Sequence, residues 1–169
     1  MSTNILLAVD AAPRDPARHV FAAAAMAGEL SRDTGDHVIV LHVHEFAVGR
    51  FGRLRVDCAD GEGESVVETI VSDLRAAGVS AEGQIREAHV GHIATVILSA
   101  AEEHQARIVV LGSSSRTDLP RLLLGSVASR LLHMAARPVL IVPRSDAPAR
   151  ARQPVAATTA AATTAASGG

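Results

Sequence analysis

A glycine- and serine-rich loop between two apolar segments carries the residues most able to do chemistry in this chain of 169 residues. The apolar run 108–111 ends at Gly112, three serines follow up to Ser115, and the pair Gly125 and Ser126 comes nine residues later. Backbone N–H groups beside a glycine turn, or in the first turn of a helix, bind anions such as phosphate without a lysine. The spacing therefore indicates an anion site, although a tight turn before an N-capped helix would use the same residue types.

Two elements must position this loop. Four consecutive apolar residues at 108–111, three of them β-branched, predict a strand that is buried on both faces. After Gly125, an apolar stripe at helical spacing predicts a helix, with Ser126 placed to accept from its first free N–H groups. The stripe consists of Val127, Leu131, Leu132 and Met134. A strand, a small-residue loop and a helix N-terminus together form the usual anion site of an open α/β sheet.

The same segment resembles the signature of the universal stress protein family. In the ATP-binding members of that family the pattern is Gly, two residues, Gly, nine residues, Gly, then Ser or Thr. Gly112, Gly125 and Ser126 match it, whereas Ser115 stands where those members have the second glycine. The segments 121–128 and 137–143 also resemble the family closely.

The resemblance implies a bound adenine nucleotide, ATP in the first place, with or without Mg²⁺. Carried over residue by residue, it implies cofactor-binding positions at Asp10, Val43, Leu111, Gly112, Ser115, Gly125, Ser126 and Val127. Val43 matches the position whose backbone recognises the adenine. Asp10 matches a carboxylate that contacts the nucleotide, but an aspartate that caps its own loop is an equally good interpretation. The residues after it, 11–13, depart from the small polar pair that is common in the family.

Apolar periodicity along the chain predicts five strands that alternate with four helices, a pattern typical of the α/β class. The strands are expected at 5–9, 37–44, 79–87, 108–111 and 138–142, and the helices at 16–32, at 64–77, from 91 and from 125. We expect one open, doubly wound parallel five-stranded sheet in a single domain, residues 1–146, of the adenine nucleotide hydrolase-like or Rossmann-like kind. Residues 46–63 are expected to form a long loop, and the Ala/Thr-rich segment 147–169 a disordered tail.

Composition narrows the range of partners. The net charge is −2 and the chain has three Phe but no Trp or Tyr, so nothing favours binding to nucleic acid. All the basic residues are Arg, which excludes a Walker-type lysine. We expect no signal peptide and no membrane span, and the single Cys58 fits a reducing compartment, so we expect a cytoplasmic protein.

Two alternating histidines could suggest a metal site. His42 and His44 project from one face of the expected strand, and Glu45 follows them. Further ligands cannot be named from the sequence, so we expect no metal site. Cys58 is interpreted as a loop cysteine without a role rather than as a reactive thiol, because no histidine partner can be inferred for it.

No catalytic residues are expected. The chain lacks a Gly-x-Ser-x-Gly nucleophile elbow, a Gly-x-Gly-x-x-Gly loop, and the Ser-Gly-Gly loop of ligases and hydrolases with this fold. The resemblance implies a stress-response signalling module that binds ATP, hydrolyses it slowly at most, and forms homodimers through an edge strand. That strand contains Val139, Leu140, Ile141 and Val142. The alternative is a dimeric interaction module of the same family that binds no nucleotide.

Overall fold

The computed structural model describes residues 3–11, 16–50, 52–113 and 125–143. Its strands are β1 (Asn4–Val9), β2 (His37–Gly49), β3 (Gly52–Arg55), β4 (Ala81–His89), β5 (Ala106–Gly112) and β6 (Val139–Val142). Its helices are α1 (Pro16–Thr34), α2 (Glu62–Ala76), α3 (Ile93–Glu103) and α4 (Ser126–Met134). The chain therefore has the expected α/β class, with four helices in the described residues.

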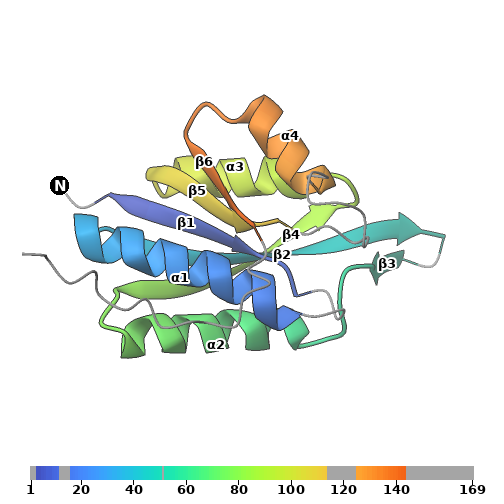
Figure 1. Ribbon diagram of the computed structural model, residues 1–169. Coiled ribbons are helices and arrows are strands. Elements are labelled where there is room, and N and C mark those ends of the chain that lie inside the picture. Colours follow the sequence, from blue (N-terminus) through green and yellow to red (C-terminus); the bar gives the residue numbers. More distant parts are fainter. Residues whose placement is uncertain (1–2, 12–15, 51, 114–124, 144–169) are drawn as a thin grey trace, which may run out of the picture.

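The strands form a mostly parallel open sheet. β2 pairs with β1 and β4, β1 pairs with β5, and β5 pairs with β6, all in parallel. Helices α1 and α2 lie against one face of the sheet, and α3 and α4 lie against the other (Figure 1). This is the doubly wound arrangement predicted from the alternation of strands and helices.

Each face of the sheet has its own apolar core, because side chains alternate along buried strands. In β1, Ile5 and Leu7 face α1 and α2, whereas Leu6 faces α3 and α4. Central strands that are apolar on both faces require helices on both sides, which explains the continuous apolar runs in the sequence. Among the described residues, no helix combines the length and the hydropathy needed to cross a membrane.

The expected loop 46–63 is partly wrong. β2 runs five residues beyond His44, and β3 pairs with its end as an antiparallel hairpin, which gives the sheet a sixth strand. The guanidinium of Arg53 lies 3.8 Å from the ring centroid of Phe46 and donates to Glu87 at 2.6 Å. The hairpin projects beyond the end of β1 and is mostly exposed, so it lacks the apolar alternation that identifies a strand in sequence (Figure 1).

The amino ends of three strands meet at one buried carboxylate. Asp36 precedes β2 and accepts from Thr3 before β1, from Thr34 at the end of α1, and from Arg107 in β5. Burial acts to raise the pKa of Asp36, but the hydrogen bonds from Thr34, Thr3 and Arg107 outweigh it and hold the pKa below its ordinary value. The carboxylate therefore links β1, β2 and β5 by hydrogen bonds at the amino edge of the sheet, opposite the edge at which Gly112 lies.

Candidate functional site

The order of the strands reverses next to β1. The chain passes from β1 to β2 and β4 on one side, and then returns to build β5 and β6 on the other. In open α/β sheets a ligand binds in the crevice at the carboxyl ends of the strands, where the order reverses. The structure thus places a candidate ligand site beyond the ends of β1 and β5.

Two of the predicted site residues lie at this point. Ala8 pairs with Leu111, so Asp10 and Gly112 leave the sheet side by side at its carboxyl edge. Asp10 is exposed and Gly112 is half-buried, so both are accessible from that edge. Leu111 itself is packed in the core on the α3 and α4 face, which leaves its backbone as the part available to a ligand.

Helix α4 contributes its N-terminus. Gly125 is the N-cap residue, and among the described residues no side chain caps the first turn with a hydrogen bond. Ser126 is therefore the first helical residue, and its expected role as the cap is wrong. Since Ser129 is the first residue whose N–H reaches back to Gly125, the N–H groups of residues 126–128 lack a partner within the helix.

Val43 occupies a distinct position on β2. The pairing with β1 ends at His42, so Val43 is the first β2 residue with no β1 neighbour. Its side chain is buried on the α3 and α4 face, together with that of Leu111. Val127 is half-buried against the same core, and Ser115 lies outside the described residues. The structure thus brings together the carboxyl ends of β1, β2 and β5. The contribution of Ser115 to a ligand site stays a prediction.

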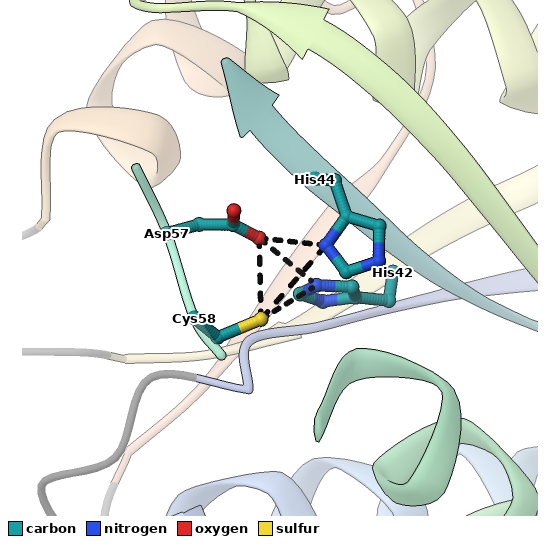
Figure 2. A group of neighbouring side chains, drawn as sticks. All are labelled: His42, His44, Asp57 and Cys58. Atoms are coloured by element: carbon teal, nitrogen blue, oxygen red, sulfur yellow. Dashed lines mark hydrogen bonds and ion pairs between the residues drawn. The ribbon is translucent and has the colours of Figure 1, made fainter. Parts of the chain in front are cut away.

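A second group of polar residues lies on the opposite face of β2, and the sequence analysis missed half of it. His42 and His44 point toward α1 and α2 and are 2% and 3% exposed. Asp57 and Cys58, in the segment between β3 and α2, face them (Figure 2). The four ligand-type atoms lie within 4.8 Å of one another. Glu45, which the sequence placed with the histidines, instead accepts from the N–H of Gly91 at 2.6 Å.

Asp57 is the centre of this His–Asp–Cys cluster. Its Oδ2 lies 3.3 Å from Nε2 of His42, 2.9 Å from Nδ1 of His44 and 3.4 Å from Sγ of Cys58. Its Oδ1 is buried and has no hydrogen-bond partner among the described residues. Burial alone would raise the pKa of Asp57, but hydrogen bonds from His44, from its own N–H and from Cys58 lower it. The carboxylate is thus charged and incompletely satisfied.

The outer nitrogens of both histidines are held by other groups. Nδ1 of His42 lies 3.0 Å from the carbonyl oxygen of Val9, and Nε2 of His44 lies 3.1 Å from Oε1 of Glu64. The N–H of Glu64 itself and the His44 ring lower the pKa of the Glu64 carboxyl. These contacts fix both rings, so their inner nitrogens face Asp57.

Cys58 is not poised as a nucleophile. Its Sγ lies 3.9 Å from Nε2 of His42 and 3.8 Å from Nδ1 of His44. Burial and the neighbouring Asp57 carboxylate raise the pKa of the thiol to about 11, so the free thiolate is scarce at neutral pH. No partner for Cys58 could be inferred from the sequence, because the hairpin that returns the chain to β2 was not predicted. The alternation of His42 and His44 along the strand was the sequence signal for this cluster, and it identified the two histidines but not Asp57 and Cys58.

The sheet, its reversal point and the two covering layers define an open, doubly wound α/β protein. The sequence model of the universal stress protein family matches residues 1–143, so the chain belongs to the universal stress protein family. The expected family is therefore confirmed.

Individual relatives agree with this assignment. The universal stress protein MJ0531 of Methanocaldococcus jannaschii is 35% identical over 81 residues, which are 48% of this chain and 46% of that protein. The match thus spans about half the length of the relative. The solved universal stress protein of Archaeoglobus fulgidus is 25% identical with a TM-score of 0.67, and covers 84% of this chain and 99% of its own.

Some solved relatives contain nucleotides. A universal stress protein from Archaeoglobus fulgidus in complex with dAMP is 23% identical, covers 83% of this chain and 97% of its own, and has a TM-score of 0.61. An Arabidopsis thaliana member with AMP bound is 20% identical, covers 85% and 93%, and has a TM-score of 0.59. A member in complex with cAMP is 19% identical, covers 85% and 98%, and has a TM-score of 0.59. At these identities the likeness establishes the shared fold.

Proposed function

We propose that this chain binds an adenine nucleotide, ATP in the first place, at the carboxyl edge of the sheet where β1 and β5 part. The observation that supports the proposal is that Asp10 and Gly112 leave neighbouring strands at the reversal point of a universal stress protein fold, and that the next helix along the chain, α4, begins with N–H groups that have no partner within the helix. Relatives with this fold contain dAMP, AMP or cAMP, which supports an adenine nucleotide as the ligand class.

The residues at this edge fit such a ligand. The N–H groups of residues 126–128, which have no partner within α4, can donate to phosphate oxygens, and the helix dipole favours the negative charge. Asp10 offers an acceptor for a ribose hydroxyl. The free backbone edge of β2 at Val43 offers hydrogen bonds to the adenine ring. An Mg²⁺ ion bound with ATP would reduce the repulsion between the phosphates and the Asp10 carboxylate.

The described residues offer no nucleophile and base at this edge, so binding rather than turnover is the proposed activity. We further propose that nucleotide occupancy is signalled through a homodimer formed along β6, in response to cellular stress. The alternative is a family member that has lost nucleotide binding and acts as a dimeric interaction module. Ser115 favours this alternative, because it replaces a glycine of the ATP-binding pattern.

The decisive experiment looks for the ligand directly. Purified protein is denatured, and the supernatant is analysed by chromatography for released nucleotide. Calorimetric titration with ATP, ADP and AMP then compares the wild type with Gly125→Val and with the control Asp73→Asn, an exposed change on α2.

Gly125→Val is a clean probe because Gly125 has φ −59° and ψ 159°, which any residue adopts. The fold should persist while the branched side chain occupies the space of the phosphate. We expect the wild type and the control to bind and Gly125→Val not to bind. If folded wild-type protein neither releases nor binds an adenine nucleotide, the interaction-module alternative stands.

A further inference from the structure

We propose that His42, His44, Asp57 and Cys58 form a tetrahedral binding site for one Zn²⁺ ion, on the α1 and α2 face of β2 and built from none of the residues proposed to bind the nucleotide. His42 and His44 supply imidazole nitrogens, Asp57 a carboxylate oxygen and Cys58 a sulfur, and all four ligand atoms converge on one point between β2 and the segment before α2 (Figure 2). Imidazole, thiolate and carboxylate are the three ligand types that Zn²⁺ uses in proteins.

The spacing of the atoms suits a tetrahedral ion. Zinc bonds of about 2.0–2.3 Å place two nitrogen or oxygen ligands about 3.3 Å apart, and a sulfur about 3.6 Å from either. The two N···O distances are 3.3 and 2.9 Å, the two S···N distances are 3.9 and 3.8 Å, and the S···O distance is 3.4 Å. Five of the six edges of the tetrahedron thus lie within about half an ångström of the ideal values, and the sixth, between the two histidine nitrogens, is at most 4.8 Å and would have to shorten when the ion binds.

The outer contacts of the histidines suit metal ligation as well. A metal-bound histidine donates its second N–H to a carbonyl or a carboxylate, which fixes the tautomer and the orientation of the ring. His42 has the carbonyl of Val9 at 3.0 Å and His44 has the carboxylate of Glu64 at 3.1 Å, both on the side away from the cluster. When these outer nitrogens carry the protons, each ring has its other nitrogen free to bind a metal ion at the centre of the cluster.

Without a metal ion, the arrangement is favourable only if an inner histidine nitrogen takes up a proton and the ring becomes charged. If the outer nitrogens carry the protons, two lone pairs face the charged Asp57 carboxylate at 3.3 and 2.9 Å. If the inner nitrogens are protonated too, two imidazolium rings lie with centroids 4.7 Å apart in a buried position. A Zn²⁺ ion among two neutral imidazoles, a carboxylate and a thiolate gives a neutral site and removes both conflicts. It would also lie close to the Asp57 carboxylate, whose buried Oδ1 has no hydrogen-bond partner in the part of the chain that the structure describes.

The ligand count points to a structural ion. Four protein ligands leave no open position for a substrate, so the ion would join the segment at Asp57 and Cys58 to β2 rather than act as a catalyst. Glu64 is a positioning residue in this arrangement because it holds His44 and does not reach the ion.

The test uses the full chain, stripped of metal by a chelator and studied without nucleotide. Wild-type protein is titrated with Zn²⁺ by calorimetry, and with Co²⁺ by absorption spectroscopy. Tetrahedral Co²⁺ absorbs strongly in the visible, and a cobalt–thiolate bond adds a charge-transfer band. The variants are Cys58→Ser, Asp57→Asn and Glu64→Gln, with His133→Gln as the control because His133 is an exposed histidine on α4. Circular dichroism verifies that each variant is folded.

We expect one Zn²⁺ per chain and a tetrahedral Co²⁺ spectrum with a thiolate band, in the wild type and the control alike. Cys58→Ser should lose the band. Glu64→Gln, on a half-exposed residue that leaves the core intact, should keep the band and weaken Zn²⁺ binding about 10- to 100-fold. Asp57→Asn should weaken binding beyond that range.

Three results would overturn the site: no saturable Zn²⁺ binding by the folded wild type, a Co²⁺ complex without a thiolate band, or Cys58→Ser binding as tightly as the wild type. The wild-type spectrum is sufficient by itself, so unfolding of a variant does not leave the question open. Because the titration contains no nucleotide, failure here is distinct from failure of the proposed nucleotide binding.

Discussion

Gly63, in the first turn of α2, lies directly against the ring of His42. A Cβ atom at Gly63 would be 2.4 Å from Cδ2 and 2.7 Å from Nε2 of His42, and 2.7 Å from Cε1 of His44. Contacts below 3.0 Å are not tolerated, so one of the groups would have to move. The absence of a side chain at Gly63 is thus what allows α2 to close over the His–Asp–Cys cluster.

Gly63→Ala should therefore destabilise the protein. An alanine normally stabilises a helix by about 1 kcal/mol relative to glycine. Overpacking against two buried rings opposes this gain and costs about 1–3 kcal/mol. We expect a lower free energy of unfolding in urea, measured without added metal. Gly49→Ala is the matched control because the nearest atom to its Cβ is the carbonyl oxygen of Gly52 at 4.0 Å. Equal stability of the wild type and Gly63→Ala would contradict the packing described here.

Asp36 should make folding sensitive to acid. Its pKa is lowered in the folded state, so the unfolded chain binds a proton more readily, with an ordinary pKa of about 3.9. The stabilisation is then fully present above about pH 5 and is lost as the pH falls through the lowered folded-state value. Asp36→Asn should lower the free energy of unfolding at pH 7 by about 1–3 kcal/mol and flatten its decline in acid.

Urea denaturation at a series of pH values measures both effects. The control is Asp33→Asn, an exposed carboxylate near the end of α1, which should retain the wild-type dependence on pH. An acid profile of Asp36→Asn that parallels the wild type would show that Asp36 is not responsible.

Ser115→Gly should tighten ATP binding. The glycine of the family pattern either adopts a positive φ or lets the backbone approach phosphate closely, and a Cβ opposes both. A left-handed conformation costs a residue other than glycine about 1–2 kcal/mol, which corresponds to about ten- to thirtyfold in affinity. Calorimetric titration measures the change, with Ser115→Ala as a control that keeps the Cβ. Unchanged affinity in Ser115→Gly would show that this position does not limit binding.

The proposed dimer can be tested at Ile141. The carbonyl oxygen of Pro138 accepts from Val109 in β5, and that of Val142 accepts from Ser113, directly after β5. In a parallel strand the N–H and C=O of one residue point to the same side, and successive residues point to opposite sides. Ile141 precedes Val142, so its N–H points away from β5, to the open edge of β6. Ile141→Pro removes that N–H without breaking the pairing with β5, and should convert a dimer to a monomer in sedimentation. Ile141→Val keeps the N–H and should remain dimeric. A wild-type protein that is monomeric at a concentration of about tens of micromolar would exclude the dimer.

The sequence predicted the elements whose signal is local. The apolar run 108–111 became β5, and the helical spacing from Val66 to Leu74 became α2, because burial selects those patterns directly. The third strand was found two residues from its predicted start, since β4 is an edge strand with few large apolar residues. The doubly wound parallel sheet also followed from the alternation of strands and helices.

The His–Asp–Cys cluster could not be predicted in the same way. Its members come from β2 and from a segment 13 residues later, and they meet because the hairpin between them turns the chain back. The register of that hairpin depends on its turn and on contacts such as Arg53 with Phe46, which leave no periodic signal. The loop around Ser115 and the tail at 147–169 lie outside the described residues, so their predicted roles remain predictions.

The buried Asp36 lies at the amino edge of the sheet, whereas Asp10, Gly112 and the His–Asp–Cys cluster lie toward the carboxyl edge. Substitutions that change ligand preference therefore fall far from the carboxylate that fastens three strands. Mutations at well-separated sites act nearly additively on stability. This separation makes the scaffold evolvable, since new ligand specificities can arise at one edge while the other continues to maintain the fold.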